Sequence, residues 1–221
     1  MVNNKTQKAD FWVLFVYYNP RKMSLIPPSI AIFSRLLKSM GVEVALFDTT
    51  LYEKHEDCDV EVIDEKNLVS KPFSDNLNKY RDKIVYKTTD VYSDLGKIVN
   101  EFKPDLLAVT AVESTFEGSI RLLKSIHRHK IPTIMGGVFA TFAPHIAIAR
   151  PEVDMICIGE GERALVELVD KMRKGEDYSH VSNLWVKDPD GTLTKSCENT
   201  LKRLAGDHGK VLFIRPVSAK V

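Results

Sequence analysis

The chain has 221 residues, enough for one substantial α/β domain with additions or two small domains, and its 44% hydrophobic and 28% charged residues are typical of a folded protein. Lys and Arg number 31 against 30 Asp and Glu, so the net charge of +1 excludes a broad electrostatic surface for nucleic acid or for an anionic membrane. We therefore expect a neutral or small partner, with neither nucleic acid nor a membrane bound.

Cysteine usage and the N-terminal apolar run indicate a cytoplasmic protein. Cys58, Cys157 and Cys197 are widely spaced and form no Cys-x-x-Cys pair, so we expect reduced, unpaired thiols. The run Phe11–Tyr18 is too short to cross a bilayer and has no small-residue cleavage site, which favours a strand over a signal peptide or a membrane helix.

Short apolar runs alternate with stretches of helical period along most of the chain. This alternation is typical of a parallel sheet covered by helices on both faces. The predicted strands are Phe11–Tyr18, Val42–Phe47, Leu106–Thr110, Thr133–Met135 and Met155–Ile158.

Helical periodicity lies between these runs. The predicted helices are Ile30–Met40, opened by Pro28 and Ser29; Val91–Phe102; Glu117–Arg128; and Arg163–Lys174, ended by Gly175. Prolines follow two of them, since Lys103-Pro104 and Ile131-Pro132 disfavour further helix. The pattern predicts a Rossmann-like, flavodoxin-type α/β fold with a doubly wound, five-stranded parallel sheet.

The domain boundaries follow from the segments outside this repeat. Residues 1–180 are predicted as the Rossmann-like domain, with the polar stretch 52–90 as an insertion or a loop. Residues 181–200 are predicted as a β-hairpin in which Asn183–Lys187 and Thr192–Thr194 flank Asp188–Gly191, with Gly191 supplying a positive φ. The tail 201–221 is unassigned.

The loops after the strands are where an open parallel sheet binds its ligand. The third and fourth of these loops combine the hydroxyls of Thr110, Ser114 and Thr115 with the bare backbone of Gly136 and Gly137. Such a set suits a flat, mostly uncharged heterocycle with a sugar-phosphate tail. The glycine-rich turns that bind a nucleotide pyrophosphate, Gly-x-Gly-x-x-Gly and Gly-x4-Gly-Lys-Ser/Thr, are missing from the expected places.

Four motifs in order resemble a known family. LIPPSIAIFSRLLKSMGVEVALFDT, FKPDLLAVTAVEST, IPTIMGGVFATFAP and VDMICIGEGERALVELV are similar to the cobalamin (vitamin B12)-binding N-terminal domain of cobalamin-dependent radical S-adenosylmethionine (SAM) enzymes. The resemblance runs from Phe11 to about Gly191, and the ordered series is far more specific than any single motif.

The resemblance implies a site for the nucleotide tail of cobalamin. Thr110 matches a hydroxyl residue that contacts the tail, and Gly136-Gly137 match a pair that gives the dimethylbenzimidazole room, so we expect these glycines to form a slot. The full set of expected cofactor-binding residues is Pro27, Thr110, Ala111, Val112, Ser114, Thr115, Gly136, Gly137, Val138, Phe139, Thr141, Gly159, Glu160 and Gly161.

Two departures from family patterns carry consequences. Classical cobalamin proteins place a cobalt-binding histidine after the first strand, whereas Asn19–Pro28 has none, as in many radical SAM members; Phe139 stands where the family often has histidine. Three scattered cysteines cannot supply the Cys-x3-Cys-x2-Cys of a [4Fe–4S] cluster. We therefore expect cobalamin without an iron–sulfur cluster in this chain, with no catalytic residue and no protein metal ligand.

The predicted function is a cobalamin-binding module of methyltransferase type that needs a radical SAM barrel in cis or in trans. A fragment, a truncated product and a separate subunit all stay open. The alternatives are a free-standing corrinoid carrier, or a degenerate domain that keeps only an interaction or sensing role.

Several residues also have plainer interpretations. Gly136-Gly137 can form only a tight turn, Thr110 can satisfy a strand end, and Glu160 can simply favour the start of the last helix. A phosphorylated receiver domain would need an acidic pair after the first strand, where Tyr18-Asn19 offers no carboxylate.

Overall fold

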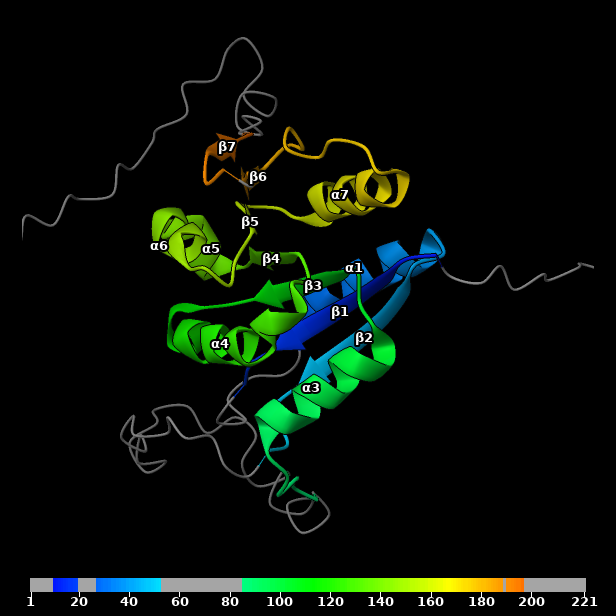
Figure 1. Ribbon diagram of the computed structural model, residues 1–221, viewed down its shortest axis with the longest axis vertical. Helices are drawn as coiled ribbons and strands as arrows, with labels where there is room; N and C mark the ends of the chain where they lie inside the picture. The colour runs from blue at the N-terminus through cyan, green and yellow to red at the C-terminus, as the bar shows by residue number, and fades with distance from the viewer. Residues whose placement is uncertain (1–9, 20–26, 53–84, 189, 197–221) are drawn as a thin grey trace, which may run out of the picture.

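The computed structural model describes residues 10–19, 27–52, 85–188 and 190–196. The predictions for most of the 52–90 insertion, for most of the first loop, for Cys58 and Cys197 and for the tail lie outside these residues. What is described forms one sheet with helices on both faces (Figure 1).

Seven strands form the sheet, in the order β2-β1-β3-β4-β5-β6-β7. They are β1 (Trp12–Tyr17), β2 (Glu43–Asp48), β3 (Leu106–Thr110), β4 (Thr133–Gly136), β5 (Met155–Cys157), β6 (Leu184–Lys187) and β7 (Leu193–Lys195). The first five are parallel, and their order is the flavodoxin-like one. Strands β6 and β7 are antiparallel to their neighbours.

The described helices connect these strands. They are α1 (Pro28–Ser39), α3 (Val91–Phe102), α4 (Glu113–Ile126) with the 3₁₀ turn η2 (His127–His129), α5 (Val138–Phe142), α6 (Pro144–Ala149) and α7 (Glu162–Lys174). Gly175 ends α7 in the left-handed conformation at φ 66°, as predicted for a C-cap glycine.

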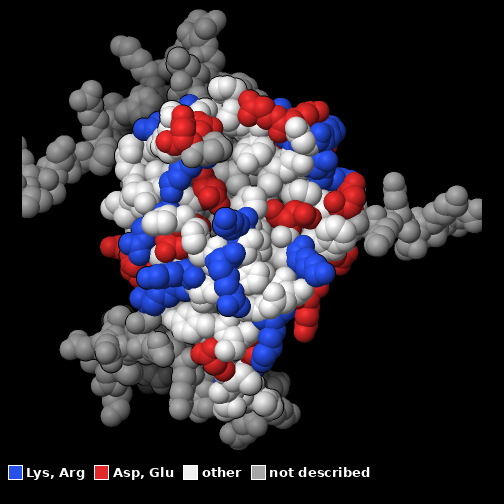
Figure 2. Space-filling model, in the orientation of Figure 1, with Lys and Arg blue, Asp and Glu red and all other residues white. Residues whose placement is uncertain are grey.

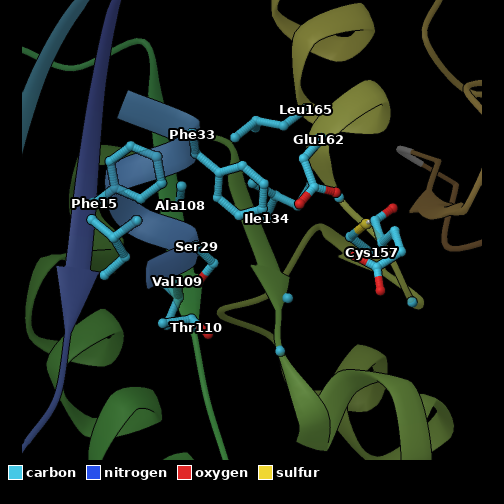
Figure 3. Close-up of a pocket in the computed structure, with 16 residues that line it drawn as sticks. Phe15, Ser29, Phe33, Ala108, Val109, Thr110, Ile134, Cys157, Glu162 and Leu165 are labelled. Carbon is cyan, nitrogen blue, oxygen red and sulfur yellow. Dashed lines mark hydrogen bonds between the residues drawn. The ribbon is translucent and has the colours of Figure 1, made fainter. Parts of the chain in front are cut away.

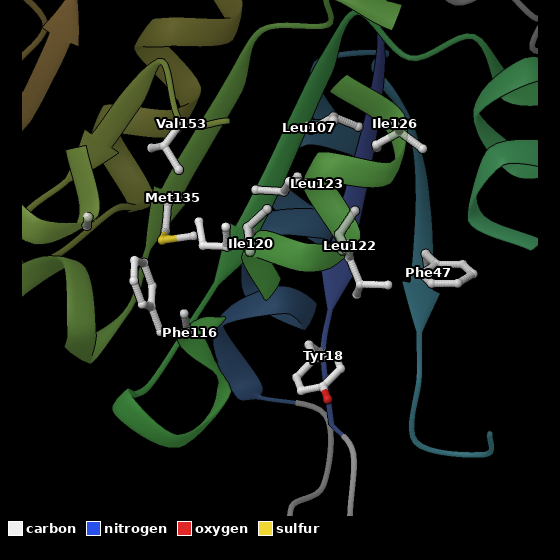
Figure 4. Close-up of a cluster of buried hydrophobic side chains, with 14 of the residues drawn as sticks. Tyr18, Phe47, Leu107, Phe116, Ile120, Leu122, Leu123, Ile126, Met135 and Val153 are labelled. Carbon is white, nitrogen blue, oxygen red and sulfur yellow. The ribbon is translucent and has the colours of Figure 1, made fainter. Parts of the chain in front are cut away.

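The sheet separates two hydrophobic cores. Alternate residues of β1 and β3 point to opposite faces, so that Val13 and Phe15 pack with α1 and α7, whereas Leu14 and Val16 pack with α3, α4, α5 and α6. Figure 4 shows the second core, where Ile120, Leu122 and Leu123 of α4 lie against the strands. Burial on both faces explains why the strands read as continuous apolar runs.

The comparison with the sequence prediction requires corrections. Each of the five predicted parallel strands lies within one residue of an observed strand. The sheet has seven strands rather than five, because the predicted hairpin pairs with β5 and continues the sheet. Helix α4 starts at Glu113 instead of Glu117.

Helices α5 and α6 were also not predicted. They have 5 and 6 residues, too short to show a helical period, and Pro144 interrupts the pattern between them. Within the described ranges, no helix is long and apolar enough to cross a membrane.

Candidate functional site

A cavity of about 160 Å³ lies between the sheet and helices α1 and α7, toward the carboxyl ends of β3, β4 and β5 (Figure 3). This is the edge at which open parallel sheets bind ligands. The residues that line it are Phe15, Ser29, Ile30, Phe33, Ala108, Val109, Thr110, Ile134, Gly136, Gly137, Cys157, Gly159, Glu160, Gly161, Glu162 and Leu165.

Strand register builds the floor of this cavity. Phe15 lies beside Ala108, and Ala108 beside Ile134, so that one row crosses three strands. Two residues further along, Thr110 lies beside Gly136. The second row carries smaller side chains, and this leaves space above the sheet.

The helices form the opposite wall. Phe33 reaches from α1 and Leu165 from α7 toward the sheet (Figure 3). The ring of Phe33 stacks beside that of Phe15, with centroids 6.5 Å apart and an interplanar angle of 11°. A Cβ on Gly161 would lie 3.1 Å from the Phe33 ring, so this glycine lets the ring approach the loop before α7.

The two adjacent glycines have different roles. A Cβ on Gly136 would meet only the Cβ of Cys157, at the ordinary distance of 3.9 Å, so the absence of a side chain keeps the cavity open. Gly137 has φ 96°, and a Cβ there would lie 2.7 Å from the carbonyl oxygen of Ala111 and 2.8 Å from Oγ1 of Thr110. Gly137 lines the cavity as well, but the close approach of the chain's own β3–α4 loop already requires a glycine at this position.

Thr141 braces the rim of the cavity. Its hydroxyl donates to the carbonyl oxygen of Gly137 at 3.1 Å and accepts the N–H of Gly159 at 3.0 Å. The side chain thus joins the loops after β4 and β5, and it supports the cavity without lining it.

The remaining expected residues are divided between the cavity and its surroundings. Thr110, Gly136, Gly137, Gly159, Glu160 and Gly161 line it, and Pro27 is the N-cap of α1, two residues before Ser29. Seven expected residues do not line the cavity: Ala111, Val112, Ser114, Thr115, Val138, Phe139 and Thr141.

Two of these residues have local partners. The Thr115 hydroxyl accepts the N–H of Val112 at 3.0 Å and thereby caps α4. Phe139 stacks on Phe116 with ring centroids 4.0 Å apart, on the other face of the sheet. Both side chains therefore make contacts within the protein that stabilise the fold.

The charge in the cavity is acidic. Glu160 and Glu162 are its charged side chains, and no Lys, Arg or His is present among the described residues that line it. Burial, together with these two carboxylates, raises the pKa of the Cys157 thiol to about 12. Cys157 is accordingly a neutral thiol near pH 7 and a poor metal ligand.

Sequence reasoning missed the walls of the cavity. Phe33, Ile134 and Leu165 were read as ordinary helix and strand positions, because only the packing of α1 and α7 on the sheet brings them together. The signal available was Ala108, a small residue in an otherwise bulky strand whose side chain faces the same side as Thr110.

Part of the site lies in a stretch that matches a known family. Residues 80–169 match the family model of the B12 binding domain. This stretch is therefore similar to the B12 binding domain. The resemblance predicted from the four sequence motifs is confirmed, and so is cobalamin as the cofactor of this domain type.

The proteins to which the chain is similar are longer than the chain itself. An uncharacterized methyltransferase of Pyrococcus horikoshii is 32% identical over 101 residues, which are 44% of this chain and 22% of the relative. The radical SAM methyltransferase TsrM of Kitasatospora setae, solved with cobalamin and a [4Fe-4S] cluster, superposes with a TM-score of 0.64 at 18% identity, covering 91% of this chain and 30% of TsrM.

A second solved structure shows the same fold. The cobalamin-dependent SAM radical enzyme OxsB, with aqua-cobalamin and SAM bound, gives a TM-score of 0.60 at 18% identity over 86% of this chain and 22% of OxsB. This chain thus spans less than a third of the length of each of these proteins.

Proposed function

We propose that this protein is a cobalamin-binding module that places the nucleotide tail of the cofactor in the cavity between the sheet, α1 and α7. The observation that carries the proposal is the open position at Gly136, at the carboxyl edge of a flavodoxin-like sheet, with apolar walls on both sides. A flat benzimidazole suits such walls, since aromatic and aliphatic groups line ligand pockets with few polar contacts.

Named residues would hold the tail. Phe15, Ala108 and Ile134 form the floor beneath the base, and Phe33 forms the facing wall. Thr110 stands at the strand end, where its hydroxyl can donate to the polar part of the tail. Bound cobalamin supplies a cobalt centre that carries a methyl group or an electron, and the protein supplies position and shielding.

The module is proposed to bind cobalamin without a histidine ligand to cobalt. No histidine occurs in Asn19–Pro28, and none of the described residues that line the cavity is a histidine. The described part of the chain contains no group of three or more His, Cys, Asp or Glu residues that could hold a metal. With its own base held in the cavity and no histidine to replace it, the cofactor would show the absorption spectrum of a base-off cobalamin.

The reaction is proposed to belong to a radical SAM barrel of methyltransferase type, in cis or in trans. This part of the proposal is supported by the fold shared with TsrM and OxsB, of which the B12-binding domain is only a part. The module itself would present cobalamin and would not be catalytic alone.

The test is a titration of the purified chain with hydroxocobalamin, followed by desalting and absorption spectroscopy. We expect a retained, base-off corrinoid for the wild type and a loss of affinity of about tenfold or more for Gly136→Leu, which corresponds to about 1.4 kcal/mol or more. The larger side chain would fill the cavity at a position with an ordinary φ.

The matched control is Gly96→Leu on α3, where a Cβ meets nothing within 4 Å. This variant should bind cobalamin like the wild type. Both variants should keep the melting temperature of a folded protein. Unchanged affinity in a folded Gly136→Leu variant would show that the tail lies elsewhere, and no retained corrinoid in the wild type would contradict the proposed function.

A further inference from the structure

The deep part of the cavity is apolar on both of its long sides. Ala108 and Ile134 form its floor in register, the near-parallel rings of Phe15 and Phe33 lie along one end, and Leu165 covers it from α7. Each of these side chains is hydrophobic, and all except Phe33 are buried in the core on this face. A group that enters here leaves water without gaining a polar partner from these walls.

The polar side chains that line the cavity are few, and two of the five are carboxylates. They are the hydroxyls of Ser29 and Thr110, the neutral thiol of Cys157 and the carboxylates of Glu160 and Glu162. An ionised carboxylate can only accept. Ring nitrogens with lone pairs therefore find few donors here, and lone pairs that face a carboxylate repel it.

We propose that this cavity selects the base of the corrinoid tail, taking a benzimidazole and discriminating against a purine. The inference rests on the proposed function. A dimethylbenzimidazole has one unsubstituted ring nitrogen and an otherwise apolar outline, which the floor and the aromatic wall complement. Adenine carries several ring nitrogens and an amino group. The carboxylates can accept hydrogen bonds from the amino group, but the ring nitrogens would lose their hydrogen bonds to water and gain few from the protein.

Ile134 is the specificity-determining residue within this arrangement. It is buried, lies between Ala108 and the β5 strand, and lines the cavity at the β4 end of the floor. A hydroxyl at this position would give a purine nitrogen a partner and would make the floor less favourable for the apolar edge of the benzimidazole.

The experiment measures the affinity of the chain for three corrinoids by equilibrium dialysis with absorption detection. They are hydroxocobalamin, the cobamide with adenine as its base, and cobinamide, which lacks the nucleotide tail. We expect the wild type to bind cobalamin about tenfold or more tighter than the adenine cobamide, a ratio equivalent to about 1.4 kcal/mol. Cobinamide should bind more weakly than cobalamin.

Ile134→Thr and Ile134→Val form a matched pair, because Thr and Val share a shape and differ by one hydroxyl. The preference for cobalamin should decrease several-fold in the Thr variant and persist in the Val variant. The wild-type ratio alone is decisive if the Thr variant fails to fold.

The outcomes separate the two proposals. Equal affinity of the wild type for cobalamin and the adenine cobamide would overturn base selection while the proposed function stands. Equal affinity for cobalamin and cobinamide would overturn base selection and also the proposed placement of the tail in the cavity, since the tail would then contribute nothing. Binding of none of the three corrinoids would overturn both proposals.

Discussion

Gly136 and Gly137 are neighbours in the sequence with opposite surroundings. Gly136 ends β4 beside Thr110, and its missing side chain leaves an opening over the sheet. Gly137 presses against the Ala111 backbone in a conformation, φ 96° and ψ −175°, that is almost restricted to glycine. One glycine thus keeps a cavity open, and the other allows two loops to meet.

This difference predicts opposite effects of one substitution on stability. Gly137→Ala should lower the free energy of unfolding by about 2 kcal/mol or more, because it combines backbone strain with contacts under 3 Å. Gly136→Ala should leave it unchanged or raise it by up to about 1 kcal/mol, since alanine restricts the unfolded chain. Urea denaturation of both variants measures the difference, and equal losses would contradict the assigned roles.

At the scale of elements, long apolar or periodic segments were predictable and short ones were not. The five parallel strands and helices α1, α3 and α7 were found from sequence because each buries a continuous run or one helical face. Helices α5 and α6 depend on packing against the core for their stability, which a local pattern does not show. The first turn of α4 was read as a ligand loop because its serine and threonine also suit a helix cap.

Helix α4 approaches the sheet closely at Gly118. A Cβ there would lie 2.0 Å from the ring of Tyr18, which is only 5% exposed and packed in the core shown in Figure 4. Gly96 in α3 instead faces open space. The two helical glycines are therefore a matched pair for testing how α4 is placed.

We expect alanine to have opposite effects at these two positions. Gly96→Ala should raise the free energy of unfolding by about 0.5–1 kcal/mol through helix propensity. Gly118→Ala should lower it by about 1–3 kcal/mol, because the Tyr18 ring must move. Thermal or urea denaturation of each variant gives the sign, and a stabilised Gly118→Ala protein would show that α4 lies further from the sheet.

At the scale of the whole molecule, the sequence predicted the location of the site better than its walls. βα alternation predicts parallel strands, and this placed Thr110, Gly136 and Gly159 at the same carboxyl edge of the sheet. Phe33 and Leu165 belong to helices far apart in the chain, and which side chains face each other across the cavity is decided by how α1 packs on α7.

The charged side chains on the face in Figure 2 form no large patch of one sign. Basic and acidic side chains are intermixed on the face in Figure 2, in keeping with a net charge of +1. The cavity offers carboxylates and, among the described residues that line it, no cation. Burial of the base and its shape should therefore dominate the affinity.

This balance predicts a weak dependence of cobalamin affinity on salt. Between low and high ionic strength the dissociation constant should change by no more than about twofold, because screening acts on charge pairs that the cavity does not provide. Equilibrium dialysis over a salt series measures this. A steep loss of affinity with salt would reveal a cation that holds the phosphate of the tail.

The position of the cavity between α1 and α7 has a consequence for the dynamics of the fold. A tail clamped there would act as a non-covalent crosslink between an early and a late segment of the chain, on opposite sides of β3 and β4 in the sheet order. Local unfolding that moves α1 or α7 away from the sheet would release the ligand. Bound cobalamin would therefore raise the free energy of each such local unfolding event. The cofactor would thereby couple the unfolding of α1 to that of α7.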